Sequence, residues 1–156
     1  MKIYIGSDHK GLELKKEIIN SLKGKYEIID SKIKNNPEDD YPDFAFDVCN
    51  NVIKDKDSFG IVICGNGIGV SIAANKVKGI LCARVTNEED ARNAKTHNNA
   101  NVIALGGISL NTAINIIEAY ISAPVINEER HLRRVSKIIK YEQGEYNELW
   151  YLYILN

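Results

Sequence analysis

The sequence lacks the features that mark membrane-spanning, secreted and metal-binding proteins. None of its apolar runs approaches the roughly 20 residues that a spanning helix needs, and charged residues interrupt the first apolar runs after Met1, which argues against a secretory leader. It has only three cysteines, Cys49, Cys64 and Cys82, an odd set without CxxC spacing. This argues against a disulfide framework or a zinc site and predicts reduced thiols in the cytoplasm. The histidines also lack a metal-ligand spacing, so we expect no metal site.

An excess of charge of one sign is also lacking. The net charge of the 156 residues is -1, so no positive field favours nucleic acid or an anionic membrane. Apolar residues make up 44% and charged residues 26%, as in soluble globular proteins. We expect a single domain at 1–146, followed by an apolar tail at 147–156 that packs on this domain or on a partner subunit.

Strand and helix patterns alternate along the chain. Apolar runs predict five strands at 2–5, 26–30, 59–64, 79–84 and 101–105. Helical spacing of apolar residues predicts helices between them and a last basic helix at 127–141. Thr86 and Glu89 have the spacing of a capping box, at the start of a helix that ends near His97. This alternation predicts an α/β fold in which helices cover both faces of a parallel sheet.

Polar residues that could take part in catalysis or binding follow two of the predicted strands. Asp8 and His9 follow the first strand, and Cys64 follows the third. In parallel sheets, ligands bind outside the carboxyl ends of the strands. Asn98 instead precedes the fifth strand, so we expect it at the opposite edge of its own sheet, or close to a partner's site.

The stretch CGNGIG at 64–69 places three alternating glycines between a strand and a helix. Gly65, Gly67 and Gly69 let backbone N–H groups approach an anion, either a phosphate or a developing oxyanion. The dinucleotide fingerprint GxGxxG fails at Val70, and a tight turn without a ligand is the alternative. Cys64 stands directly before the loop, a position that favours a reactive thiolate acting as nucleophile or as general base.

The basic run at 130–134 contains two arginines that are candidates for binding a phosphate. Arg130 and Arg134 are four residues apart and share one helix face. Exposed ion pairs with Glu128 and Glu129 are the alternative. His9 and His97 are candidate acid–base groups near neutral pH, or ordinary surface histidines.

Taken together, these residues resemble the ribose-5-phosphate isomerase B family, which also includes galactose-6-phosphate isomerase subunits. The resemblance is carried by GSDHKG at 6–11, DYPDFA at 40–45, CGNGIGVSIAANK at 64–76, HNNANVIALG at 97–106 and the pairs Arg130-His131 and Arg134-Val135. It implies a three-layer α/β/α Rossmann-like sandwich that works as a homodimer, sometimes a tetramer, with active sites between subunits. It also implies an aldose–ketose isomerase of the pentose phosphate pathway, which interconverts ribose 5-phosphate and ribulose 5-phosphate through an enediolate and needs no cofactor.

The resemblance assigns a role to each candidate residue. Cys64 matches the base that removes the proton from sugar C2, and His97, assisted by Asp8, matches the group that opens the furanose ring. The other matching residues bind the substrate: His9, Tyr41, Gly65, Asn66, Gly67, Ile68, Gly69, Ser71, Asn98, Arg130 and Arg134.

Three positions depart from the pattern of some relatives. Val70 stands where some use a glutamate as base, which makes this chain the cysteine type. Asn66 replaces a frequent threonine and Ile108 a frequent arginine, so the preferred sugar can differ. Two alternatives therefore stay open: the same chemistry on a six-carbon sugar phosphate, such as allose or galactose 6-phosphate, and a non-catalytic sugar-phosphate binding protein.

Overall fold

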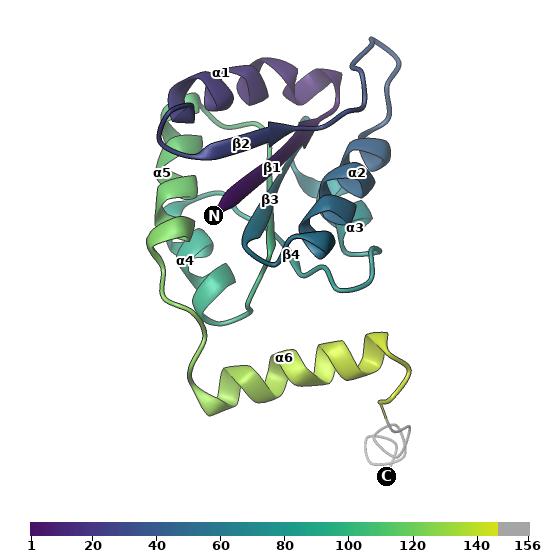
Figure 1. Cartoon of the computed structure of the whole chain (residues 1–156), viewed down its shortest axis with the longest axis vertical. Coiled ribbons are helices and arrows are strands. Elements are labelled where there is room, and N and C mark those ends of the chain that lie inside the picture. The colour runs from purple at the N-terminus through teal and green to yellow at the C-terminus, as the bar shows by residue number, and fades with distance from the viewer. Residues whose placement is uncertain (147–156) are drawn as a thin grey trace.

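Five parallel strands form the central sheet of the computed structural model, which describes residues 1–146 (Figure 1). They are β1 (Lys2–Ser7), β2 (Glu27–Asp30), β3 (Ser58–Ile63), β4 (Cys82–Arg84) and β5 (Val102–Leu105), in the spatial order β2-β1-β3-β5-β4. The predicted five-stranded parallel sheet is therefore confirmed. The expected packing of the tail at 147–156 lies outside the described residues.

Helices cover both faces of the sheet, which confirms the three-layer α/β/α sandwich. Figure 1 shows α1, α4 and α5 on one face and α2 and α3 on the other. The helical segments are η1 (His9–Gly11), α1 (Leu12–Leu22), α2 (Tyr41–Lys54), α3 (Ile68–Ala74), α4 (Glu88–Thr96), α5 (Leu110–Ser122) and α6 (Glu129–Glu142).

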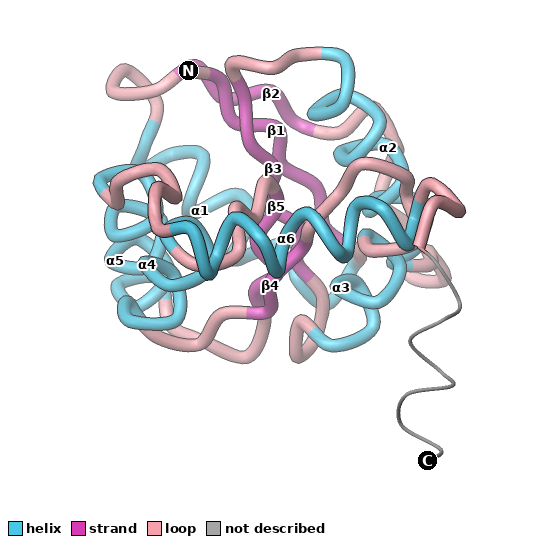
Figure 2. Tube along the Cα trace, turned by 90° about the horizontal axis from the view of Figure 1, so that it is seen from below, coloured by secondary structure: helices cyan, strands magenta, loops and turns pink. Residues whose placement is uncertain are grey.

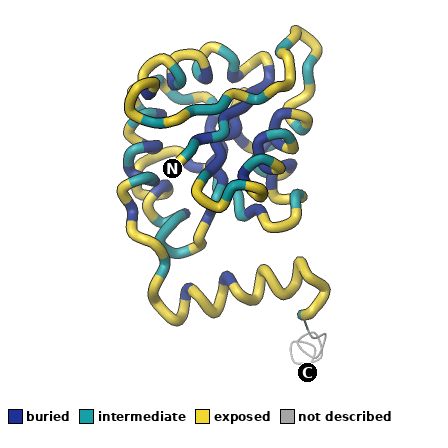
Figure 3. The backbone as a smooth tube through the Cα atoms, viewed as in Figure 1, coloured by how far each residue is buried: buried dark blue, intermediate teal, exposed yellow. Residues whose placement is uncertain are grey.

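The central strands are apolar on both sides because both of their faces are covered. Along β3, Ile61 and Ile63 enter the core beneath α1, α4 and α5, whereas Val62 faces the core beneath α2 and α3. Cys64 continues this alternation on the second side. The buried strands lie at the centre of the molecule in Figure 3. The buried residues of β3 therefore lead directly to Cys64 at the edge of the sheet.

The predicted cap of α4 was wrong by one residue. Asn87, not Thr86, is the N-cap, and its side-chain oxygen accepts a hydrogen bond from the Asp90 N–H at 2.8 Å. The Asp90 carboxylate in turn accepts from the Thr86 hydroxyl at 3.0 Å. Asn is at least as good a cap as Thr, and the sequence fits both registers.

Helix α6 lies apart from the sandwich, at the amino edge of the sheet (Figures 1 and 2). Figure 2 shows it crossing in front of the sheet when the molecule is seen from below. Only His131 and Val135 of this helix are buried, and most of it is exposed in Figure 3. Its exposed apolar side chains are Leu132, Ile138, Ile139 and Tyr141. In the single chain, α6 therefore leaves an apolar face uncovered.

Candidate active site

Asp8 and Cys64 emerge side by side at the carboxyl edge of the sheet. Ser7 at the end of β1 pairs with Ile63 at the end of β3. The Asp8 N–H continues this pairing by donating to the Ile63 carbonyl at 3.3 Å. The chain runs from β1 outward to β2 and then returns past β1 to β3, and such reversals in strand order are where parallel sheets bind ligands.

The glycine loop, Gly65–Gly69, presents unpaired backbone donors. Within residues 1–146, no group accepts a hydrogen bond from the N–H of Gly65, Asn66 or Gly67. Gly67 has a φ of 76°, a left-handed conformation that glycine adopts without strain. The next N–H, of Ile68, is already bonded to the Asn66 side-chain oxygen at 3.0 Å. Successive backbone N–H groups without a partner are suited to bind an anionic oxygen.

Two neighbouring strands hold the glycine loop in place. A Cβ on Gly106, just after β5, would lie 2.5 Å from the Gly67 nitrogen and 2.7 Å from the Asn66 carbonyl carbon. The loop therefore packs directly on bare backbone. From the end of β4, the Arg84 Nε donates to the Asn66 carbonyl at 2.8 Å. Neither contact was predictable from the sequence, because neither produces a local pattern.

The three thiols occupy different environments. Burial raises the pKa of Cys49 to about 12, and burial also raises the pKa of Cys82, followed by the effect of nearby Cys49. Both therefore stay protonated and pack as apolar groups. Cys64 is 6% exposed and belongs to the same apolar cluster, but it borders the free N–H groups of the glycine loop.

Local hydrogen bonds fix Asp8 and His9. The Asp8 carboxylate accepts from the N–H groups of Lys10 at 3.0 Å and Gly11 at 3.1 Å, which caps the short helix η1. The next residue, His9, is bound through both its N–H and its Nδ1 to one oxygen of Asp39, each at 2.8 Å. Asp39 was not among the predicted site residues.

Tyr41 borders the glycine loop from the start of α2. A Cβ on Gly69 would lie 2.7 Å from the Tyr41 Cζ, so the tyrosine ring rests on the bare backbone of α3. Ile68 is 48% exposed beside it. The Ser71 hydroxyl, one turn further, donates to the Ile68 carbonyl at 2.7 Å. These predicted residues therefore lie together with Cys64.

The remaining predicted residues gather at the amino edge instead. His97 caps the end of α4, exposed Asn98 follows it, and Arg130 and Arg134 are exposed on α6. The Arg130 Nε is paired with Glu128 at 2.9 Å, as the ion-pair alternative predicted. In the described part of the chain, Arg134 has no acidic partner within salt-bridge distance.

His131 stacks on His97, a contact that the sequence did not predict. The two rings stack with centroids 4.3 Å apart and planes inclined by 17°. Burial lowers the pKa of His131, and the nearby charges of His97 and Arg130 lower it further. A neutral His131 ring therefore packs flat on His97.

The two groups of predicted residues lie on opposite edges of one sheet. The Gly60 N–H donates to the Asn101 carbonyl near the amino edge, and the Cys64 N–H donates to the Leu105 carbonyl at the carboxyl edge. Four residues of strand separate them, roughly 13 Å at about 3.3 Å per residue. The intervening side chains are buried core, so the two groups do not meet within one chain.

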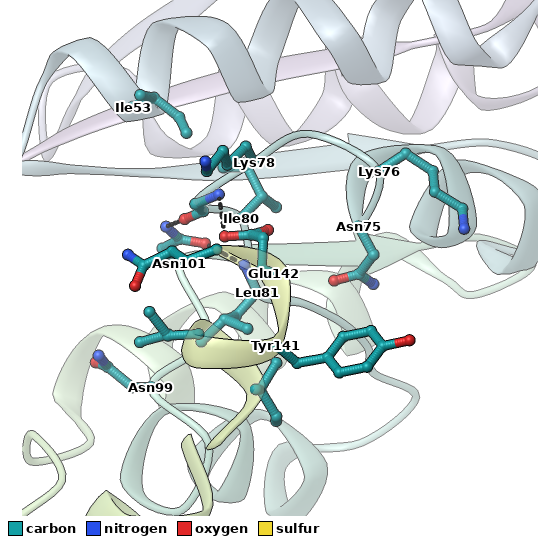
Figure 4. Close-up of a pocket in the computed structure, with 14 residues that line it drawn as sticks. Ile53, Asn75, Lys76, Lys78, Ile80, Leu81, Asn99, Asn101, Tyr141 and Glu142 are labelled. Carbon is teal, nitrogen blue, oxygen red and sulfur yellow. Dashed lines mark hydrogen bonds between the residues drawn. The ribbon is translucent and has the colours of Figure 1, made fainter. Parts of the chain in front are cut away.

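A groove of about 860 Å³ separates α6 from the amino ends of β4 and β5 (Figure 4). Figure 4 shows Glu142 reaching from α6 into it, where its carboxylate accepts from the Gly79 N–H at 2.9 Å. We call it the α6 groove; its apolar lining comprises Ile53, Ile80, Leu81, Ile138, Ile139 and Tyr141.

Membrane and metal features are lacking in the described residues. No helix in 1–146 has both the length and the apolar character needed to cross a membrane. The same residues contain no group of three or more His, Cys, Asp or Glu side chains arranged to hold a metal ion.

The fold and the carboxyl-edge site define an α/β enzyme with a glycine loop beside a thiol. The chain belongs to the Ribose/Galactose Isomerase family, whose sequence profile matches residues 3–138. It is 40% identical over 147 residues to the ribose-5-phosphate isomerase B of Mycolicibacterium paratuberculosis, a match that covers 92% of each chain.

Two solved structures share this fold. The ribose-5-phosphate isomerase B of Clostridium thermocellum is 46% identical with a TM-score of 0.86, over 92% of this chain and 99% of that one. The Mycoplasma genitalium enzyme, solved with bound ribulose-5-phosphate, is 45% identical with a TM-score of 0.84, over 91% and 96% of the two chains. The predicted family and isomerase class are confirmed.

Proposed function

We propose that the chain interconverts ribose 5-phosphate and ribulose 5-phosphate, with Cys64 as the base. The observation that carries this proposal is the Cys64 thiol beside three unpaired N–H groups, those of Gly65, Asn66 and Gly67. The bound ribulose-5-phosphate of the Mycoplasma genitalium relative supports the choice of sugar.

The reaction moves one proton between two neighbouring carbons. The Cys64 thiolate takes the proton from C2 of the open-chain aldose, the C–H electron pair forms the C1=C2 bond, and the carbonyl pair moves to O1. The N–H groups of the glycine loop stabilise this enediolate oxygen. Return of the proton to C1 and transfer of the O2 hydrogen to O1 complete the ketose. Such chemistry needs a reduced thiol, which suits the cytoplasm.

The residues at the amino edge act on the same sugar from a second copy of the chain. His97, with Asp8, opens the furanose ring, while Arg130 and Arg134 join His9 in binding the phosphate. Their distance from Cys64 within one chain and the uncovered apolar face of α6 support a homodimer that completes each site.

The first test is conversion of ribose 5-phosphate by the purified chain, with allose 6-phosphate and galactose 6-phosphate in parallel. Preferred turnover of the pentose supports the proposal. The family also includes galactose isomerases, so preferred turnover of a hexose phosphate would favour that alternative. Binding of all three sugars without turnover would indicate a non-catalytic binding protein.

Mixing two impaired variants restores activity if sites are shared between subunits. Cys64→Ala removes the base, and Arg134→Ala removes a charge-assisted phosphate contact, which lowers kcat/KM by about 10–100-fold. After joint refolding at equal amounts, about half of the dimers are mixed, and each has one intact site. We therefore expect recovery of about a quarter of the parent kcat/KM.

The control for this experiment is Arg133→Ala, an exposed neighbour on α6 that retains parent activity. Native mass spectrometry verifies that mixed dimers form. Mixed dimers that stay inactive would show that Cys64 and Arg134 serve the same site from one chain, against the shared arrangement.

A further inference from the structure

The carboxylate of Asp39 is buried in a full set of hydrogen bonds. Its side chain is only 4% exposed. One oxygen accepts from the N–H and the Nδ1 of His9, each at 2.8 Å. The other oxygen accepts from the Asn35 amide at 2.9 Å and from the Asn36 N–H at 3.0 Å. A charged group this well satisfied is fixed in position.

The asparagine that binds Asp39, Asn35, is itself held by hydrogen bonds to β1 and α1. The Asn35 amide also donates to the Ser7 carbonyl at 2.7 Å, at the carboxyl end of β1. The Lys15 ammonium, on a side chain 4% exposed, contacts the Asn35 side-chain oxygen at 3.4 Å and Asp30 at 2.8 Å. The loop at 31–40 is thus tied to β1 and α1, although it has no regular secondary structure.

This arrangement decides which nitrogen of His9 faces outward. With Nδ1 donating to Asp39, the other nitrogen, Nε2, is the one directed away from the carboxylate, on a side chain 37% exposed. To bind a phosphate, Nε2 must carry a proton and donate it. Both nitrogens are then protonated, and the ring is a cation between two anions, Asp39 and the phosphate.

Asp39 remains ionised while it accepts the hydrogen bond from His9. Burial raises the pKa of Asp39, but hydrogen bonds from Asn35 and His9 outweigh that effect and lower it to about 2. Among the described residues, Asp39 is also the one carboxylate within salt-bridge distance of His9.

We propose that Asp39 is a positioning residue that turns His9 into a cationic phosphate anchor, with Nδ1–H held by Asp39 and Nε2–H offered to the substrate. This inference rests on the proposed function, in which His9 binds the phosphate. Asp39 acts only through His9 and touches no reacting atom, so it affects substrate binding far more than the proton transfer.

The kinetic test is Asp39→Asn, with Glu38→Gln as the matched control. Both variants remove one negative charge from the same loop, but Glu38 is exposed. We expect Asp39→Asn to raise KM for ribose 5-phosphate by about 10-fold or more with kcat nearly unchanged, a loss typical of orienting partners. Glu38→Gln keeps the parent KM. An unchanged KM in Asp39→Asn, with an active parent, would overturn the inference.

A double variant separates positioning from a general loss of structure. If Asp39 acts through His9, adding Asp39→Asn to His9→Ala causes no further rise in KM. Additive effects of the two substitutions would overturn the inference.

A second measurement needs no variant and no turnover. In the parent labelled with 15N-histidine, the ring of His9 is observed at pH 7.5 with and without inorganic phosphate. We expect protons on both nitrogens when phosphate is bound. A ring with a single proton in the phosphate complex, or one that phosphate leaves unaffected, would refute the cationic anchor. If the parent does not convert ribose 5-phosphate, the proposed function fails, and this spectrum still decides whether Asp39 prepares His9 for a phosphate.

Discussion

Cys64→Ala lowers kcat for ribose 5-phosphate by about 10³-fold, because it removes the group that carries the proton between C2 and C1. KM changes little, since the N–H groups of the glycine loop belong to the backbone and stay in place. The fold tolerates the change. Cys64 lies at the end of β3, where Ile61 and Ile63 are fully buried and anchor the strand without it.

Cys49→Ala is the matched control. Cys49 lies in the same apolar cluster, is fully buried, and has a thiol that burial keeps protonated. The Cys49→Ala variant loses packing in the core, but its kcat stays close to that of the parent. Retention of most activity in a folded Cys64→Ala variant would contradict the role of the thiol.

Gly106→Ala damages both the stability of the fold and the site. The new Cβ meets backbone atoms of Cys64, Asn66 and Gly67, which cannot rotate away as a side chain would. We expect a loss of about 1–3 kcal/mol in unfolding free energy, with Tm lower by roughly 2–4 °C per kcal/mol. The loop is displaced from the end of β5, so kcat falls by about 100-fold even in the folded protein.

Gly65→Ala is the comparison for stability. A Cβ at Gly65 meets only the Lys10 side chain, with Cδ at 3.2 Å, and that flexible chain can move. Its thermal unfolding should therefore stay close to that of the parent. Equal Tm values for Gly106→Ala and the parent would mean that the loop does not depend on its contact with β5.

The position of Cys64 was the easiest to predict, because this reactive side chain directly follows a strand. The apolar run before Cys64 and the glycines after it locate the residue at the carboxyl edge. A parallel strand that is buried on both faces can present side chains to a ligand only at its end. The partner of His9 was not predictable in this way. Asp39 lies 30 residues away in a polar loop, where neither apolar periodicity nor turn chemistry indicates a contact.

The position of α6 was also beyond local patterns. Its basic, amphipathic sequence predicted a helix, but the surface it packs on is decided by tertiary contacts such as the stack of His131 on His97. The cap of α4 failed for a simpler reason, because Thr86 and Asn87 are both good caps and only the folded backbone selects between them.

The strand order β2-β1-β3-β5-β4 limits the order in which the strands can pair while the chain is synthesised. Strand β4 leaves the ribosome before β5, yet β5 is its one neighbour in the sheet. At about 5–20 residues per second, the 21 residues from Arg84 to Leu105 take roughly 1–4 s. During that interval the inner edge of β3 is bare and the glycine loop lacks the strand behind it. The glycine loop therefore gains its contact with Gly106 only after β5 has been synthesised and has paired with β3.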